Sequence, residues 1–145
     1  MKIYFAGSIT GGREDEEVYH QLIAYLQKYG EVLTHHVGDI ALDQRGEQAN
    51  NVPARYIYNR DLGWMDKADV VVSEVTHPSL GTGYELAKAD TKGIPVLCLC
   101  QPLPVDRRLS ALILGNPKFI NKTYTILKEA YKYIDEFFAK LKIST

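Results

Sequence analysis

Cysteine is scarce in this 145-residue chain, since only Cys98 and Cys100 are present. They alternate within the apolar segment 95–100, so a strand would direct both thiols to one face as small buried groups. The spacing is not Cys-x-x-Cys, and none of the four histidines stands at metal-ligand spacing from another ligand type. We therefore expect reduced, buried thiols, no metal site and no cofactor.

No charge of either sign predominates and no apolar run is long. The 17 basic and 18 acidic residues give a net charge of −1, without the concentration of Lys and Arg that a polyanion-binding face requires. The apolar start is too short for a signal peptide, and no run reaches the ~20 apolar residues of a membrane span. We expect a cytoplasmic protein, also nuclear in a eukaryote, with neither nucleic acid polymer nor membrane as a partner.

Apolar segments alternate with helical patterns along the chain. The segment 69–75 lacks period-two alternation, as is typical of a strand covered on both faces of a parallel sheet. Alternating strands and helices predict right-handed βαβ units. The expected fold is α/β, a single domain over 1–145 with a small doubly wound, flavodoxin-like or Rossmann-like, mostly parallel five-stranded sheet and helices on both faces. The predicted strands are 2–6, 31–35, 69–75, 95–100 and a weaker 117–120. The predicted helices are 14–29, 54–67, 81–93 and 123–141, with a short amphipathic helix at 106–114.

Two glycine-bearing loops, at 7–13 and 79–83, follow predicted strands. In open α/β sheets ligands bind at the carboxyl ends of strands. Backbone amides, the hydroxyls of Ser8 and Thr10 and the dipole of the following helix all favour an anion there, and Arg13 can add a bidentate contact. Neither loop has Walker or dinucleotide spacing. A tight turn that merely needs small residues is the alternative.

Two acidic residues stand near these loops in the predicted fold. Glu85 falls in the first turn of the helix that follows the second loop. Asp61 lies beside the apolar stripe of another helix, on which Tyr58, Leu62 and Met65 are expected to be buried. A pair of carboxylates suits cleavage of a glycosidic bond. The pattern alone leaves open that Glu85 only complements a helix dipole and that Asp61 is a solvated surface group.

Five segments in this order resemble one enzyme family over nearly the whole chain. They are YFAGSI-x-GGRED at 4–15, DL-x-W at 61–64, ADVVV at 68–72, PSLG-x-GYEL at 78–86 and LSA at 109–111. The chain closely resembles the 2′-deoxynucleoside 5′-monophosphate N-hydrolases of the nucleoside 2-deoxyribosyltransferase superfamily.

The resemblance implies a role for each matching residue. Glu85 is expected to attack the anomeric carbon of the sugar, Asp61 to bind the sugar and assist proton transfer, and Tyr4 to support the catalytic carboxylate. The 5′-phosphate is expected to lie against a group of small residues, joined by one from the neighbouring subunit of a homodimer: Gly7, Ser8, Ser79, Gly81 and, across the interface, Ser110. The expected border of the base is Ile9, His36, Ile57 and Leu112, and the other expected substrate-binding positions are Thr10, Gly11, Gly12, Arg13 and Ala111.

One departure from the family pattern keeps further activities open. Thr10 stands where the hydrolases carry an arginine, which removes a positive charge expected near the phosphate. A transferase acting on unphosphorylated deoxynucleosides and a ribonucleotide N-glycosidase of the CMP type are therefore alternatives. A non-catalytic nucleotide-binding module is a third, although pure binding needs neither Asp61 nor Glu85 beside an anionic ligand.

Overall fold

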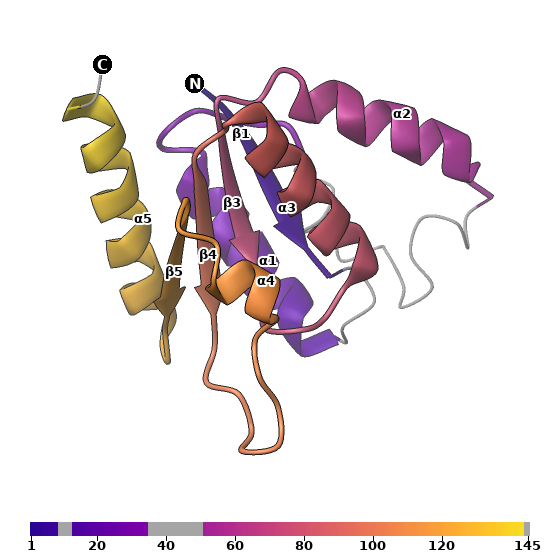
Figure 1. The fold of residues 1–145 in the computed structure, drawn as a ribbon. Helices are drawn as coiled ribbons and strands as arrows, with labels where there is room; N and C mark the ends of the chain where they lie inside the picture. The colour runs from indigo at the N-terminus through magenta and orange to yellow at the C-terminus, as the bar shows by residue number, and fades with distance from the viewer. Residues whose placement is uncertain (9–12, 35–50, 144–145) are drawn as a thin grey trace.

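The computed structural model describes residues 1–8, 13–34 and 51–143, apart from the side chains of 13–15 and 143. Its five strands form one parallel sheet in the order β2-β1-β3-β4-β5, which confirms the predicted α/β class (Figure 1). The strands are β1 (Lys2–Gly7), β2 (Glu31–Val32), β3 (Val70–Glu74), β4 (Val96–Cys100) and β5 (Phe119–Thr123). The helices are α1 (Arg13–Leu26), α2 (Ala54–Met65), α3 (Leu80–Lys92), α4 (Ala111–Leu114) and α5 (Leu127–Ile143).

Alternate residues of the central strands face two separate helical layers. Phe5, Val72 and Leu97 pack in the core beneath α1 and α5, whereas Tyr4 and Cys98 pack in the core beneath α2, α3 and α4. The chain passes from β1 through α1 to β2, which pairs with one edge of β1. It then passes through α2 to β3, which pairs with the other edge of β1. The strand order therefore reverses between β1 and β3, where the carboxyl ends of a doubly wound sheet bind ligands.

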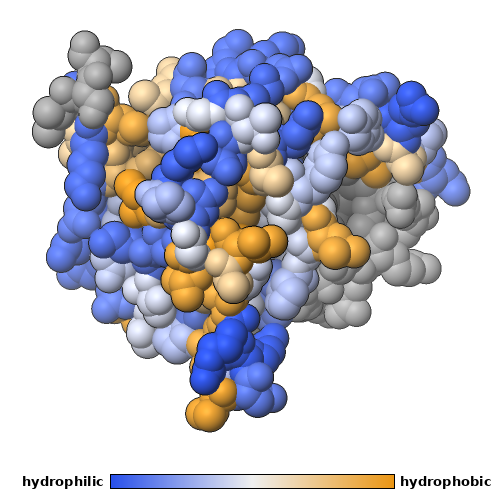
Figure 2. Space-filling model, in the orientation of Figure 1, coloured by the Kyte–Doolittle hydropathy of each residue, from blue (hydrophilic) through white to orange (hydrophobic). Residues whose placement is uncertain are grey.

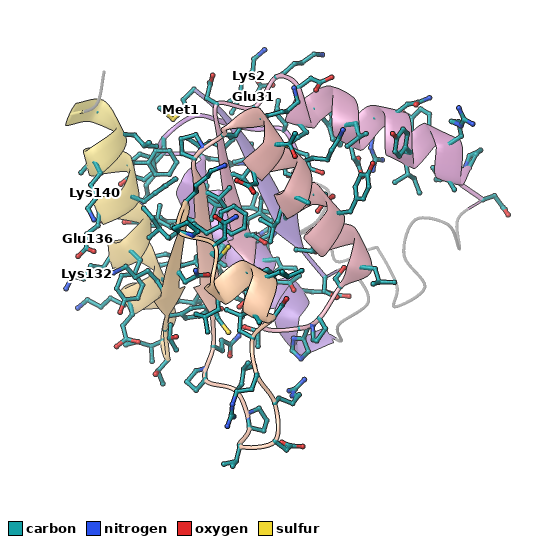
Figure 3. All side chains as sticks on the ribbon, in the orientation of Figure 1. Met1, Lys2, Glu31, Lys132, Glu136 and Lys140 are labelled. Atoms are coloured by element: carbon teal, nitrogen blue, oxygen red, sulfur yellow. The ribbon has the colours of Figure 1, made fainter. Side chains whose placement is uncertain are left out.

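The outer side of α5 carries charge and its inner side is apolar. Figure 3 shows Lys132, Glu136 and Lys140 along this helix on the side away from the sheet. Ile134 and Phe138 are buried against the sheet. No helix in the described part of the chain has the length and apolar character needed to cross a bilayer.

Two predicted boundaries are wrong for identifiable reasons. The strand predicted at 31–35 ends at Val32, because the hydroxyl of Thr34 takes over the pairing with Phe5: it accepts from the Phe5 amide at 2.8 Å and donates to the Phe5 carbonyl at 2.7 Å. The last helix begins at Leu127 rather than 123, since Thr123 pairs with Cys100 in β5.

Tyr58 was predicted to be buried on α2, and that prediction is wrong. Its exposed fraction is 50%, whereas Met65 at the other end of the predicted stripe is buried. Figure 1 shows the reason, because the first turns of α2 extend beyond the edge of the sheet. The apolar stripe is therefore covered only where α2 meets the sheet and α3.

The segment 106–114 was predicted as one short amphipathic helix, but only Ala111–Leu114 is helical. Leu109 and Ile113 pack against the core beneath α2, α3 and α4. Leu112 does not, and its exposed fraction is 87%. Figure 2 shows apolar surface over α4.

Candidate active site

A buried tyrosine and a glutamate meet between β1 and α3. The Tyr4 hydroxyl donates to Oε1 of Glu85 at 2.7 Å. Tyr4 is the third residue of the apolar β1, and its side chain packs in the core beneath α3. Glu85 lies in the second turn of α3, not in the first turn as predicted. The structure thus brings together two of the three predicted catalytic residues, 81 positions apart in the sequence.

Burial changes the protonation of both groups. It raises the pKa of Glu85 to about 7, an effect that the Tyr4 hydrogen bond opposes and the nearby charge of Asp61 reinforces. The pKa of the Tyr4 hydroxyl lies far above its ordinary value, chiefly because of burial and then because of Glu85. Tyr4 therefore remains a hydrogen-bond donor at every physiological pH, while Glu85 exchanges its proton near neutrality.

Asp61 lies near the Tyr4–Glu85 pair, at the edge between core and solvent. Its side chain is 19% exposed, and Oδ1 accepts from Nε of Arg60 at 2.8 Å. The Arg60 guanidinium lies 4.8 Å from the ring centroid of Trp64. Arg60 thereby fixes the orientation of the Asp61 carboxylate.

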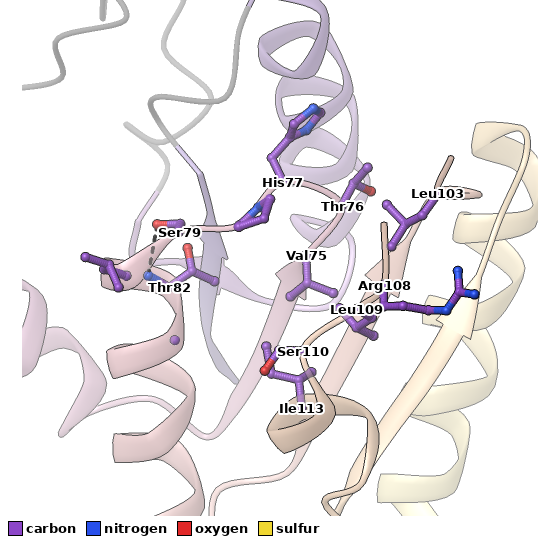
Figure 4. A pocket seen from close by; sticks show the side chains of 13 residues that line it. Val75, Thr76, His77, Ser79, Thr82, Leu103, Arg108, Leu109, Ser110 and Ile113 are labelled. Atoms are coloured by element: carbon purple, nitrogen blue, oxygen red, sulfur yellow. Dashed lines mark hydrogen bonds between the residues drawn. The ribbon is translucent and has the colours of Figure 1, made fainter. Parts of the chain in front are cut away.

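A cavity of about 360 Å³ opens beside the first turn of α3 (Figure 4). The loop after β3 and the first turn of α3 form one wall, and the segment 103–113 forms another. Ser79 caps α3, its Oγ accepting from the Thr82 amide at 3.2 Å, and Ser110 stands on the opposite wall. Two predicted phosphate-binding hydroxyls of one chain therefore border the same cavity.

Among the buried hydroxyls without a hydrogen-bond partner in the described residues, two follow a strand at this end of the sheet. Ser8 and Thr82 are both buried, and the Oγ atom of each is unsatisfied. Ser8 was a predicted site residue, whereas Thr82 was missed because nothing in a Gly-x-Gly spacing distinguishes the middle residue. A buried hydroxyl without a partner costs free energy, so both groups suit a polar ligand.

A buried carboxylate holds the two walls of the cavity together. Glu74 accepts from the Thr76 amide at 3.1 Å, from the Tyr124 hydroxyl at 3.1 Å and from the Thr76 hydroxyl. The same Thr76 oxygen accepts from the amide of Gln101 at 2.8 Å. The loop that carries Ser79 is thereby tied to the start of the segment that carries Ser110. Sequence reasoning missed this network, for which the charged Glu74 at the end of an apolar strand was the one signal.

The other predicted positions divide into three groups. Gly7 has a packing role, since a Cβ there would lie 3.0 Å from the Tyr19 ring. A Cβ at Gly81 would make an ordinary contact with the Ser79 Oγ at 3.8 Å, Ile57 is half-buried on α2, and Ala111 lies with Leu112 on the exposed α4. Ile9, Thr10, Gly11, Gly12 and His36 lie outside the described residues, and of Arg13 only the backbone, which begins α1, is described. Within the described ranges, no cluster of His, Cys, Asp and Glu could hold a metal ion.

A carboxylate whose pKa is raised to about 7 and a cavity bordered by Ser79, Thr82 and Ser110 lie toward the carboxyl edge of the parallel sheet, where α/β enzymes bind their ligands. The nucleoside 2-deoxyribosyltransferase family model matches residues 3–109, and the chain belongs to this family.

Individual relatives agree with the family assignment. The 5-hydroxymethyl-dUMP N-hydrolase of Mus musculus is 52% identical over 113 residues, which cover 78% of this chain and 64% of the longer mouse protein. The protein of the same name from Tetraodon nigroviridis is 45% identical over 98% of this chain and all of its own length. The solved CMP N-glycosidase of Clostridium botulinum shares the fold, with a TM-score of 0.62 at 18% identity, over 93% of this chain and 99% of its own.

If Glu85 is the nucleophile that the sequence predicts, it must be ionised to attack, and kcat/KM should rise with pH around a midpoint of about 7. Tyr4→Phe removes a hydrogen bond that stabilises the ionised form, so it should move the midpoint to higher pH by roughly one unit. Initial rates of base release between pH 5 and 9 measure both values. Tyr25→Phe, which removes a hydroxyl bonded to the remote Asp135, is the matched control. An unchanged midpoint in Tyr4→Phe would contradict the assignment.

Proposed function

We propose that the protein hydrolyses the N-glycosidic bond of 2′-deoxynucleoside 5′-monophosphates, releasing free base and deoxyribose 5-phosphate. The observation that carries the proposal is the buried Glu85 carboxylate, bonded to Tyr4 and near Asp61, on the helix whose first turn borders the cavity. Names of the relatives support the reaction class and add 5-hydroxymethyl-dUMP as a substrate to test.

The proposed reaction proceeds by two displacements at the anomeric carbon. A Glu85 oxygen forms a bond to C1′ while the bond from C1′ to the base nitrogen breaks, and Asp61 assists delivery of a proton to the leaving base. Water then attacks C1′ and gives its proton back to Asp61, while the bond from C1′ to the Glu85 oxygen breaks and the carboxylate leaves. Tyr4 donates to the carboxylate throughout and fixes the oxygen that does not attack.

The phosphate subsite of this proposal is the hydroxyl-lined end of the sheet. Ser8, Ser79 and Gly81 supply hydroxyls and helix-terminal amides to the anion, as helix N-termini do for phosphates.

Deoxynucleotides are intracellular metabolites, and two unpaired cysteines suit the reducing cytoplasm, where we place the enzyme.

We further propose a homodimer in which Ser110 of the neighbouring subunit completes the phosphate subsite. Two exposed leucines support a partner surface at the cavity, since Leu80 on α3 is 96% exposed and Leu112 on α4 is almost equally so. Figure 2 shows apolar surface over α4, and exposed apolar patches, unlike single exposed residues, are typical of surfaces that another protein covers. A C2 arrangement would set α4 of each subunit against the other subunit's site.

We expect kcat/KM for 2′-deoxynucleoside 5′-monophosphates to exceed that for the deoxynucleosides by about two orders of magnitude. That ratio corresponds to two charge-assisted hydrogen bonds of about 1.5 kcal/mol each, used to orient the sugar. Base release from matched pairs of nucleotide and nucleoside, with the ribonucleotides as a third set, measures it.

Each other outcome of this assay identifies a different activity. Efficient transfer of deoxyribose from an unphosphorylated nucleoside to a second base would establish the transferase. Preference for CMP would establish the ribonucleotide N-glycosidase. Binding without release of base from any substrate would establish the binding module and refute the proposal.

A further inference from the structure

We infer that Thr82 is a phosphate-binding residue of this protein, whose hydroxyl donates to the 5′-phosphate of the substrate. The inference rests on the proposed function and adds a contact outside the predicted set. The hydroxyl that would bind the ligand makes no hydrogen bond within the described part of the folded chain.

The Thr82 hydroxyl is unusual for its position. The residue is 5% exposed and lines the cavity, yet its Oγ1 atom has no hydrogen-bond partner in the described part of the chain. A helical threonine commonly bonds the carbonyl three or four residues earlier, and Thr91 on the same helix does so with Ala87 at 2.8 Å. Thr82 forgoes this bond. Since two χ1 rotamers are open to a helical threonine, its hydroxyl can turn toward a ligand without movement of the backbone.

The surroundings of Thr82 favour an anion. It is the third residue of the 13-residue α3, and the amides of Leu80 and Gly81 before it belong to the first turn, where no carbonyl of the helix can reach them. Ser79 accepts from the Thr82 amide, which leaves the Ser79 hydroxyl proton for a ligand. No carboxylate is among the described residues that line the cavity, and Figure 4 shows Ser79 and Thr82 side by side on one wall.

A phosphate monoester matches this arrangement of donors. It presents three terminal oxygens, and the first turn of α3 offers two amides and two hydroxyls at the positive end of the helix dipole. Glu85 lies three residues beyond Thr82, hence on the same side of the helix one turn further along. A nucleotide whose phosphate contacts Thr82 therefore extends its sugar toward Glu85.

The test compares Thr82→Val, which keeps the shape and removes the hydroxyl, with Thr82→Ser, which keeps the hydroxyl. We expect Thr82→Val to raise the Kd for deoxyribose 5-phosphate, measured by calorimetry, about tenfold. The KM for the nucleotide should also rise about tenfold, with kcat changed far less. Thr82→Ser should recover most of both. The melting temperature of ligand-free Thr82→Val should equal or exceed that of the wild type, because an unsatisfied buried hydroxyl is gone. Thr91→Val is the control on the same helix, and its phosphate affinity should not change.

The outcomes separate this inference from the proposed function. Weaker deoxyribose 5-phosphate binding by Thr82→Val stands even if the wild type releases no base, so that the contact would survive failure of the proposed reaction. Unchanged affinity in Thr82→Val overturns the inference. So does an equal loss of kcat/KM on nucleotides and unphosphorylated nucleosides, which would assign the hydroxyl to the sugar. A lower melting temperature in Thr82→Val with unchanged ligand affinity would show a purely structural role.

Discussion

Glu85→Gln is expected to lower the rate of base release by several orders of magnitude while the protein remains folded. The amide keeps the size of the side chain and can still accept from the Tyr4 hydroxyl, but it cannot form the bond to C1′. Single-turnover assays with a deoxynucleotide measure the loss. Mass spectrometry of the wild type, quenched during turnover, should detect the deoxyribosyl phosphate adduct on Glu85.

The stability of Glu85→Gln provides a second readout with a defined sign. Folding raises the pKa of Glu85 from 4.5 to about 7, so the folded state binds more protons than the unfolded state between these values. Wild-type stability therefore falls as the pH rises through this window, by on the order of 3 kcal/mol. Glutamine carries no charge, and the variant should be more stable than the wild type at pH 8 and about equal at pH 4.

Glu136→Gln, on the outer side of α5, is the matched control for both readouts. Its activity and melting temperature should follow the wild type. Base release by Glu85→Gln at a near-normal rate would remove Glu85 from the mechanism. A variant that is inactive and also unfolded at every pH would leave the adduct in the wild type as the deciding measurement, and absence of that adduct would refute the covalent step.

Leu112→Glu is expected to dissociate the homodimer and to abolish activity. The side chain is 87% exposed in the single chain, so a charge there leaves the core intact but would become buried, without an ion partner, in the interface. Sedimentation velocity and base release at the same protein concentration measure the two effects. Ile126→Glu, an exposed apolar position just before α5, is the control. A fully active wild-type monomer would contradict the shared site.

Mixing Glu85→Gln and Ser110→Ala subunits shows which subunit of the proposed homodimer contributes Ser110 to a site. The structure places Ser110 on the wall opposite Ser79 within one chain, so both a same-chain and a cross-subunit contact must be tested. If the contact crosses the interface, a heterodimer of Glu85→Gln and Ser110→Ala subunits contains one intact site. Activity should then rise above the sum of the two variants after subunit exchange. If Ser110 acts within its own chain, no site is intact, and the activity of the mixture stays equal to the sum of the two variants.

The order and type of the main elements followed from the sequence because their signals are local. The apolar runs of β1, β3 and β4 and Gly93, which caps the end of α3, require no knowledge of tertiary contacts. The errors arose where a remote partner decides the outcome. Thr34 ends β2 through a side-chain bond to Phe5, and Tyr58 is exposed because α2 projects past the sheet.

The same distinction applies to the site. Glu85 and Tyr4 were predicted as partners by resemblance to a family, and the hydrogen bond between them agrees with that prediction. The Glu74 network joins the ends of β3, β4 and β5, and no local pattern specifies which hydroxyls will meet a carboxylate there. Likewise, the Thr82 hydroxyl lacks a partner because the folded chain brings no described hydrogen-bonding group to it, and no local sequence pattern predicts that.

Cys98 of β4 makes the opening of the sheet measurable. It is 1% exposed beneath the α3 layer, and burial raises its pKa to about 12, so this thiol is unreactive in the native state. A thiol reagent therefore modifies Cys98 only in molecules in which β4 has separated from its neighbours. Cys100 is 7% exposed, so the measurement uses Cys100→Ala, in which Cys98 is the one remaining cysteine of the sequence and its modification rate reports the population of that opened state. Any ligand that binds only the closed sheet must slow this rate by the factor 1 + [L]/Kd, which gives its affinity even for variants that have lost all turnover.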